Sequence, residues 1–113
     1  MTSSAQFFHL LRRQIRRNFR KPLVVAVSKK LLKYRGAEST IEDFEVGLRF
    51  HRVIEDKNPD LVADSKVRKL LLCSGQIYYE LENERKKQGI NDVAIVRLEQ
   101  LCPFPFRSLE PSM

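Results

Sequence analysis

The sequence has few of the residues that build a disulfide framework or a metal centre. It contains two cysteines, Cys73 and Cys102, and two histidines, with no CxxC pair. Two cysteines make neither a disulfide framework nor a zinc site, so we expect two reduced thiols in an intracellular compartment. No apolar run approaches the ~20 residues that a membrane span needs. We therefore expect a soluble chain without a membrane partner.

Acidic residues are missing from the first third of the chain. Residues 1–37 hold ten Lys or Arg and no Asp or Glu, whereas the remainder holds eleven basic and fourteen acidic residues. The net charge of +7 therefore arises at the N-terminal end. A chain of 113 residues allows one domain at most, and such a domain buries only about two-thirds of its unfolded surface.

Residues 66–105 carry the strongest structural pattern, that of a βαβ unit. Segments 69–73 and 93–98 are apolar nearly throughout, which indicates parallel strands with both faces covered. The segment between them predicts an amphipathic helix, with Ser74 or Gly75 as the cap at its start and Gly89 as the stop. The two strands are expected to be joined by a right-handed crossover.

The N-terminal segment predicts a cationic amphipathic helix from about Ala5 to Arg17. Phe8, Leu11 and Ile15 recur at helical spacing, while the arginines cluster elsewhere on the helix surface. Three interpretations stay open. The segment has the Arg and Ser content of a targeting presequence, or it is a nonspecific phosphate-binding patch, or its arginines face solvent or acidic neighbours in a larger protein.

The middle of the chain is less regular. Leu23 to Val27 is a β-branched run that predicts a buried strand, and Lys29 to Tyr34 predicts a helical turn that stops at Gly36. Residues 48–54 alternate weakly, as an edge strand does, and 56–64 read as a polar loop. A domain boundary fits best in this stretch.

One anion or effector contact is predicted, formed by Ser74, Gly75 and Arg97. Backbone N–H groups at a strand end and helix start suit a phosphate or an acidic effector, and Arg97 approaches the same edge. Close helix packing is the better explanation for Gly75, because the turn has one glycine and no GxGxxG pattern. Arginines near strand ends usually pair with carboxylates, here Glu99.

No residue is assigned a catalytic, cofactor-binding or metal-binding role. His9 and His51 lack a nucleophile arranged beside them, so both are expected to be structural or surface groups. Glu80, Glu82 and Glu84 form a helix face rather than an acid/base pair. Tyr78, Tyr79 and Cys73 are expected to pack.

Several blocks of the sequence resemble a known family. FFHLLRRQ, FRKPLVV, SKKLLKYR, KLLLCSGQIYYELENERKK and NDVAIVRLEQLCPFPF occur in this order. They look like the C-terminal region of the thiamine-dependent first component of 2-oxoglutarate dehydrogenase, with the 2-oxoadipate dehydrogenase component as the nearest relative. Gln76 departs from the pattern, because Lys usually stands there, and the loss of this charge weakens an anion site.

The resemblance implies an α/β fold with an incomplete sheet. Residues 1–64 resemble the end of the pyrimidine-binding domain, with a helix and a strand, plus a linker. Residues 65–113 resemble the first half of a transketolase-C-terminal-like domain, built on the βαβ unit. The pattern normally continues beyond the PFPF segment, so we expect a fragment with a bare sheet edge, low stability, and dependence on a partner or self-association.

The resemblance also implies a function for the parent enzyme. That enzyme decarboxylates 2-oxoglutarate in the tricarboxylic acid cycle with thiamine diphosphate and Mg²⁺, and it passes the succinyl group to a lipoyl-bearing second component. This chain is expected to bind no cofactor and to be inactive alone, and its partners are the remaining first component and its dimer mate. The expected location is the mitochondrial matrix in a eukaryote and the cytoplasm in a bacterium. The alternative is a small basic binding module for a larger complex or nucleic acid.

Overall fold

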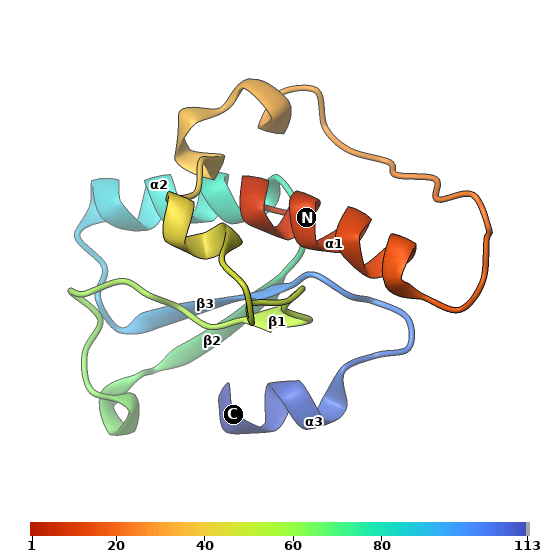
Figure 1. Cartoon of the computed structure of the whole chain (residues 1–113). Helices are drawn as coiled ribbons and strands as arrows, with labels where there is room; N and C mark the ends of the chain where they lie inside the picture. Colours follow the sequence, from red (N-terminus) through yellow and green to blue (C-terminus); the bar gives the residue numbers. More distant parts are fainter. Residues whose placement is uncertain (113) are drawn as a thin grey trace. The chain divides into compact units, whose positions relative to one another are not determined.

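A computed structural model describes residues 1–112 (Figure 1). The chain divides into two compact units, Met1–His51 and Arg52–Met113, and residue 113 lies outside the described residues. The helices and strands are α1 (Ser4–Arg16), β1 (Val53–Ile54), β2 (Lys69–Cys73), α2 (Ile77–Gln88), β3 (Val93–Leu98) and α3 (Phe106–Leu109), with short 3-10 turns between them. The predicted domain boundary between residues 64 and 65 stays a prediction.

The second unit contains a three-stranded open sheet in the order β1-β3-β2. β2 and β3 are parallel, with Lys69 opposite Val93 and Cys73 opposite Arg97. β1 pairs antiparallel with β3 at the other edge. Both predicted parallel strands and the helix between them are confirmed, so the mixed α/β class is confirmed as well.

The ends of α2 differ in how well the sequence predicted them. Gly89 ends the helix in a left-handed conformation, φ 64°, as expected of a glycine stop. The start was predicted incorrectly, because Gln76 holds the N-cap position and no side chain caps the helix there. Gly75 and Ser74 lie one and two residues before Gln76, in the connection between β2 and α2.

The core of the second unit lies on both faces of β3. Val96, Leu98 and Leu109 form one buried cluster, with the partly buried Val53 and Leu70 packed against it. Figure 1 shows α2 and α3 on opposite sides of the sheet. β3 is thus covered on both faces, as its apolar run predicted.

β2 does not have the predicted cover on both faces. It is an edge strand, and the side chain of Leu72 is 44% exposed. The rest of this chain therefore covers the apolar side chains of β2 only in part.

The first unit is built around α1, which begins at Ser4 because the side chain of Ser3 accepts a hydrogen bond from the Gln6 N–H. The predicted helix is confirmed within one residue at each end. Its buried residues are Ala5, Gln6 and His9. None of the helices formed by residues 1–112 has the length and apolar character needed to cross a membrane.

The predicted strand at 23–27 is wrong. This segment has no strand hydrogen bonds and Val24 is 91% exposed. A strand needs a neighbour for its backbone groups, and in the described part of the first unit no strand forms that it could pair with. The edge strand predicted at 48–54 is shorter than expected, because only Val53–Ile54 pairs with β3.

Candidate functional site

The predicted anion contact lies at the end of β2, where the chain turns into α2. Gly75 has φ 73°, a left-handed conformation that favours glycine, and its carbonyl accepts a hydrogen bond from the Tyr78 N–H at 3.2 Å. A Cβ added to Gly75 would meet nothing within 4 Å. The favoured explanation of close helix packing is therefore wrong, because the backbone conformation and not the space requires glycine here.

Arg97 lies next to this turn in the sheet. Its Cα is the register partner of Cys73, so Arg97 and the Ser74–Gly75 turn share one end of the parallel pair. Its guanidinium carbon stacks 4.2 Å from the centroid of the Tyr78 ring. The register therefore places the turn and Arg97 at the same sheet end, where the charge of Glu99 also acts on Cys73. The anion contact itself stays a prediction.

The aromatic residues beside Arg97 are buried, as the sequence predicted. Tyr78 and Tyr79 are 8% and 6% exposed, and their rings meet edge to face at 5.0 Å. Burial raises the pKa of Tyr79 to about 12. Burial also raises the pKa of the Cys73 thiol, although the positive charge of Arg97 opposes this effect. Both tyrosines therefore pack, and Cys73 is a weakly acidic, half-buried thiol.

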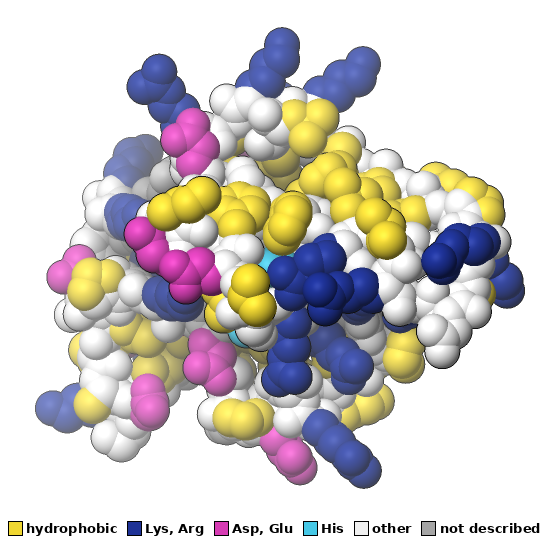
Figure 2. Space-filling view, viewed as in Figure 1, with side chains coloured by type: hydrophobic (Ala, Val, Ile, Leu, Met, Phe, Trp, Pro, Cys, Tyr) yellow, Lys and Arg dark blue, Asp and Glu magenta, His cyan; other side chains and the backbone are white. Residues whose placement is uncertain are grey.

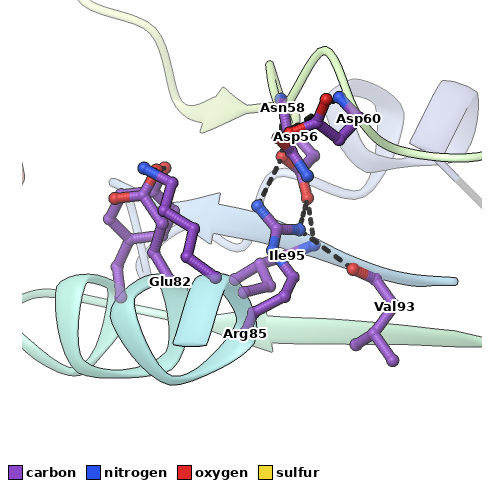
Figure 3. Close-up of polar contacts among 9 residues, drawn as sticks. Asp56, Asn58, Asp60, Glu82, Arg85, Val93 and Ile95 are labelled. Carbon is purple, nitrogen blue, oxygen red and sulfur yellow. Dashed lines mark hydrogen bonds and ion pairs between the residues drawn. The ribbon is translucent and has the colours of Figure 1, made fainter. Parts of the chain in front are cut away.

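A buried ion pair between Asp56 and Arg85 joins three elements of the second unit. Figure 3 shows the two side chains pointing toward each other from the loop after β1 and from α2. Arg85 Nη1 donates to Asp56 Oδ2 and to the Val93 carbonyl, and Arg85 Nη2 donates to Asp56 Oδ1 at 3.2 Å. The side chains are only 3% and 4% exposed. The pair therefore ties the loop to both α2 and β3.

The Asp56 carboxylate accepts further hydrogen bonds from the backbone. The Ile95 N–H donates to Oδ2 at 2.7 Å and the Asn58 N–H donates to Oδ1 at 3.0 Å. Burial alone would raise the pKa of Asp56, but the hydrogen bonds from Arg85, Ile95 and Asn58 outweigh it and lower the pKa. The hydrogen bond to Asp56 raises the pKa of Arg85. Both groups are held in their charged forms.

A family model described as 2-oxoglutarate dehydrogenase C-terminal matches residues 38–113. The chain belongs to this family. The 2-oxoglutarate dehydrogenase E1 component of Brucella abortus (strain S19) is 44% identical over 116 residues, which cover 96% of this chain and 12% of the relative. The same component of Brucella anthropi and of Brucella ovis is 43% identical over the same shares.

These comparisons confirm the family that the sequence blocks resemble. The chain spans 12% of the length of the curated relatives. The 2-oxoglutarate dehydrogenase family model begins at residue 38, so it covers the whole second unit and the end of the first. The match to the curated relatives covers nearly all of the chain, including most of the first unit.

Both histidines have structural positions in this family member. His9 is 3% exposed, its Nε2 lies 2.9 Å from the Asp43 carbonyl oxygen, and its ring meets Phe8 edge to face. His51 is exposed, and its backbone N–H and carbonyl bind the side-chain amide of Gln6 at 2.9 and 2.6 Å. The interpretation of both as structural or surface groups agrees with these positions.

Glu80 and Glu84 lie on the exposed surface of α2 as predicted, whereas Glu82 is partly buried and lies on another side of the helix. All three glutamates bind side chains one turn away on the same helix, as Gln76 with Glu80, Lys86 with Glu82, and Gln88 with Glu84. Tyr78 also donates its hydroxyl to Glu82 at 3.3 Å.

Sequence reasoning missed the partnership of Asp56. It placed Asp56 in a polar loop, and helical spacing places Arg85 on the same side of its helix as Tyr78 and Leu81. That placement was itself a usable signal, because an arginine on an apolar helix face requires a buried acceptor. The sequence did not show which of several carboxylates in the loop would supply it.

Proposed function

We propose that this chain is a structural segment of a 2-oxoglutarate dehydrogenase first component, which decarboxylates 2-oxoglutarate and transfers the succinyl group to a lipoyl arm. The observation that carries the proposal is the 44% identity over 96% of the chain to a relative named for that component. In this proposal the second unit is the first half of a transketolase-like C-terminal domain, and residues 1–64 close the pyrimidine-binding domain.

The proposed role is scaffold and interface rather than chemistry. The acidic and basic groups that the fold brings together form structural ion pairs, above all Asp56 with Arg85. Thiamine diphosphate with Mg²⁺ is the proposed cofactor of the whole enzyme. Within residues 1–112, no three His, Cys, Asp or Glu side chains gather as they would around a metal ion.

The proposed partners are the remaining first component, its dimer mate and the lipoyl-bearing second component. The proposed location is the mitochondrial matrix in a eukaryote and the cytoplasm in a bacterium. The alternative of a basic module for a larger complex or nucleic acid remains a hypothesis. Two of its arginines already stack on aromatic rings of the first unit, Arg13 on Phe50 at 4.3 Å and Arg17 on Phe19 at 5.5 Å.

A chimera tests the proposal. The segment of the Brucella abortus relative that matches this chain is replaced by residues 1–113, and carbon dioxide release from 2-oxoglutarate is measured with thiamine diphosphate and Mg²⁺ supplied. We expect an active chimera and an inactive isolated chain. A folded chimera without activity, or carbon dioxide release by the isolated chain, would contradict the proposal.

A further inference from the structure

The helix α1 leaves part of its apolar side exposed, although the Phe8 ring packs edge to face on Phe44 at 5.4 Å. An amphipathic helix normally packs its apolar stripe against the core. Here the buried residues are Ala5, Gln6 and His9, whereas Phe8, Leu11 and Ile15 are 39%, 40% and 73% exposed. These three residues, which we call the α1 stripe, are spaced i, i+3 and i+7 and therefore lie along one side of the helix.

Polar hydrogen bonds hold the opposite side of α1 against the first unit. The Gln6 amide binds the backbone of His51 in both directions, and His9 Nε2 lies 2.9 Å from the Asp43 carbonyl. The N-terminal turn is fixed as well, because Ser4 Oγ donates to the Ala37 carbonyl at 3.0 Å. The outward orientation of the α1 stripe is therefore set by specific bonds, not by a loosely placed helix.

Arginines flank the α1 stripe. Arg12 lies beside Leu11 and donates to the Leu48 carbonyl of the first unit, whereas Arg16, one turn later beside Ile15, is exposed. In Figure 2, hydrophobic side chains lie over the region of α1 next to a group of Lys and Arg side chains. An apolar stripe bordered by positive charge fits a surface that is itself apolar and bordered by carboxylates.

We propose that the α1 stripe, with the exposed Arg16 beside it, docks on an apolar surface flanked by acidic residues that belongs to the remaining first-component polypeptide. The inference rests on the proposed function, because this polypeptide supplies the 88% of the relatives' length that the chain does not cover. The charges disfavour α1 of a second copy as the occupant. Residues 1–37 contain no acid, so that pairing would set arginine against arginine.

Cysteine labelling in two contexts tests the docking. Ile15→Cys is compared in the isolated chain and in the chimera with the Brucella abortus relative, and the labelling of the residue-15 peptide is followed by mass spectrometry. Burial under a stable interface slows labelling by about tenfold or more, because the reaction then waits for local opening. Val46→Cys is the matched control, since Val46 is fully exposed and lies outside α1.

We expect protection of position 15 in the chimera only, with position 46 labelled at similar rates in both contexts. An active chimera in which position 15 is labelled as fast as in the isolated chain overturns the inference and leaves the proposed function intact. Equal protection of positions 15 and 46 also overturns it. A folded but inactive chimera counts instead against the proposed function.

A charge test and an occupancy test complete the experiment. In the chimera, Arg16→Gln is expected to reduce the protection of position 15 from labelling and to make this protection less dependent on salt. Lys33→Gln is expected to leave the protection and its salt dependence unchanged. Equal effects of the two variants overturn the role of Arg16. If position 15 is protected in the isolated chain at high concentration, the α1 stripe binds a second copy. If it is protected on anionic phosphatidylserine vesicles, the α1 stripe binds a lipid surface. Either result would overturn the proposal.

Discussion

Removing the charge of Asp56 should cost the second unit much of its stability. The carboxylate accepts four hydrogen bonds, two from Arg85 and one each from the backbone of Asn58 and Ile95. In Asp56→Asn, one of the two oxygens becomes an NH2 group, which donates. Each carboxylate oxygen of Asp56 accepts two of these bonds. In either orientation of the new amide, its NH2 group therefore faces two buried N–H donors that have lost their acceptor.

The expected loss follows from these bonds. A buried donor without an acceptor costs about 1–3 kcal/mol. Breaking a buried ion pair by removing one partner costs about 3–5 kcal/mol, because the remaining charge is left uncompensated. Two buried donors left without an acceptor cost about 2–6 kcal/mol together, a range that includes the ion-pair figure. Native domains are stable by only about 5–15 kcal/mol, so we expect Asp56→Asn to remove a large share of the free energy of unfolding.

Urea unfolding of the full chain, followed by circular dichroism, measures this loss. The matched control is Asp92→Asn, which breaks the Arg68–Asp92 pair at 2.8 Å, whose side chains are 64% and 36% exposed. Exposed pairs contribute about 0–1 kcal/mol, so the control should unfold almost as the parent does. Equal losses in the two variants would refute the reasoning. Replacing Asp56 and Arg85 together by apolar residues should cost less than removing Asp56 alone.

The same pair predicts a dependence on pH. Hydrogen bonds lower the pKa of Asp56 below its unfolded value of about 3.9, so the stabilisation is present above that pH. It is lost as the pH falls through the lower folded value, because the unfolded chain then binds a proton more readily. The melting temperature of the parent chain should therefore drop below about pH 4, and that of Asp56→Asn should drop less. Parallel profiles for the two proteins would contradict this assignment.

Two further predictions concern the turn after β2 and the thiols. Gly75→Ala should destabilise the chain by about 1–2 kcal/mol although space is open around it, because φ is 73°, and Gly75→Asn should cost less. Equal stability of Gly75→Ala and the parent chain in urea would rule this out. Cys102 is exposed, whereas burial raises the pKa of Cys73, so iodoacetamide should alkylate Cys102 first. Faster modification of Cys73, read by mass spectrometry, would reverse the order.

The sequence alone was enough to predict the βαβ unit with its strand limits. Segments 69–73 and 93–98 form β2 and β3 as predicted, and Gly89 ends α2. These features rest on local signals, namely short apolar runs and one glycine, which specify conformation within a few residues of themselves. The family was also evident from the sequence blocks, and the family model confirms it.

Where a segment depends on a neighbour, the sequence was not enough. The run at 23–27 has strand composition, but a strand forms only beside another strand, and residues 1–51 supply none. The apolar run of β2 predicted two covered faces, yet β2 lies at a sheet edge. The composition of a segment therefore indicates which conformation it favours. The neighbouring elements determine whether that conformation forms.

Only the tertiary structure decided which side of α1 is buried and which carboxylate meets Arg85. Helical spacing places Phe8, Leu11 and Ile15 on one side, and it says nothing about the bonds of Gln6 that turn this side outward. Asp56 lies 29 residues before Arg85, and no periodic pattern links the two. Contacts of this kind depend on how separate elements pack. Burying a charge is costly unless the fold places a paired, hydrogen-bonding group beside it.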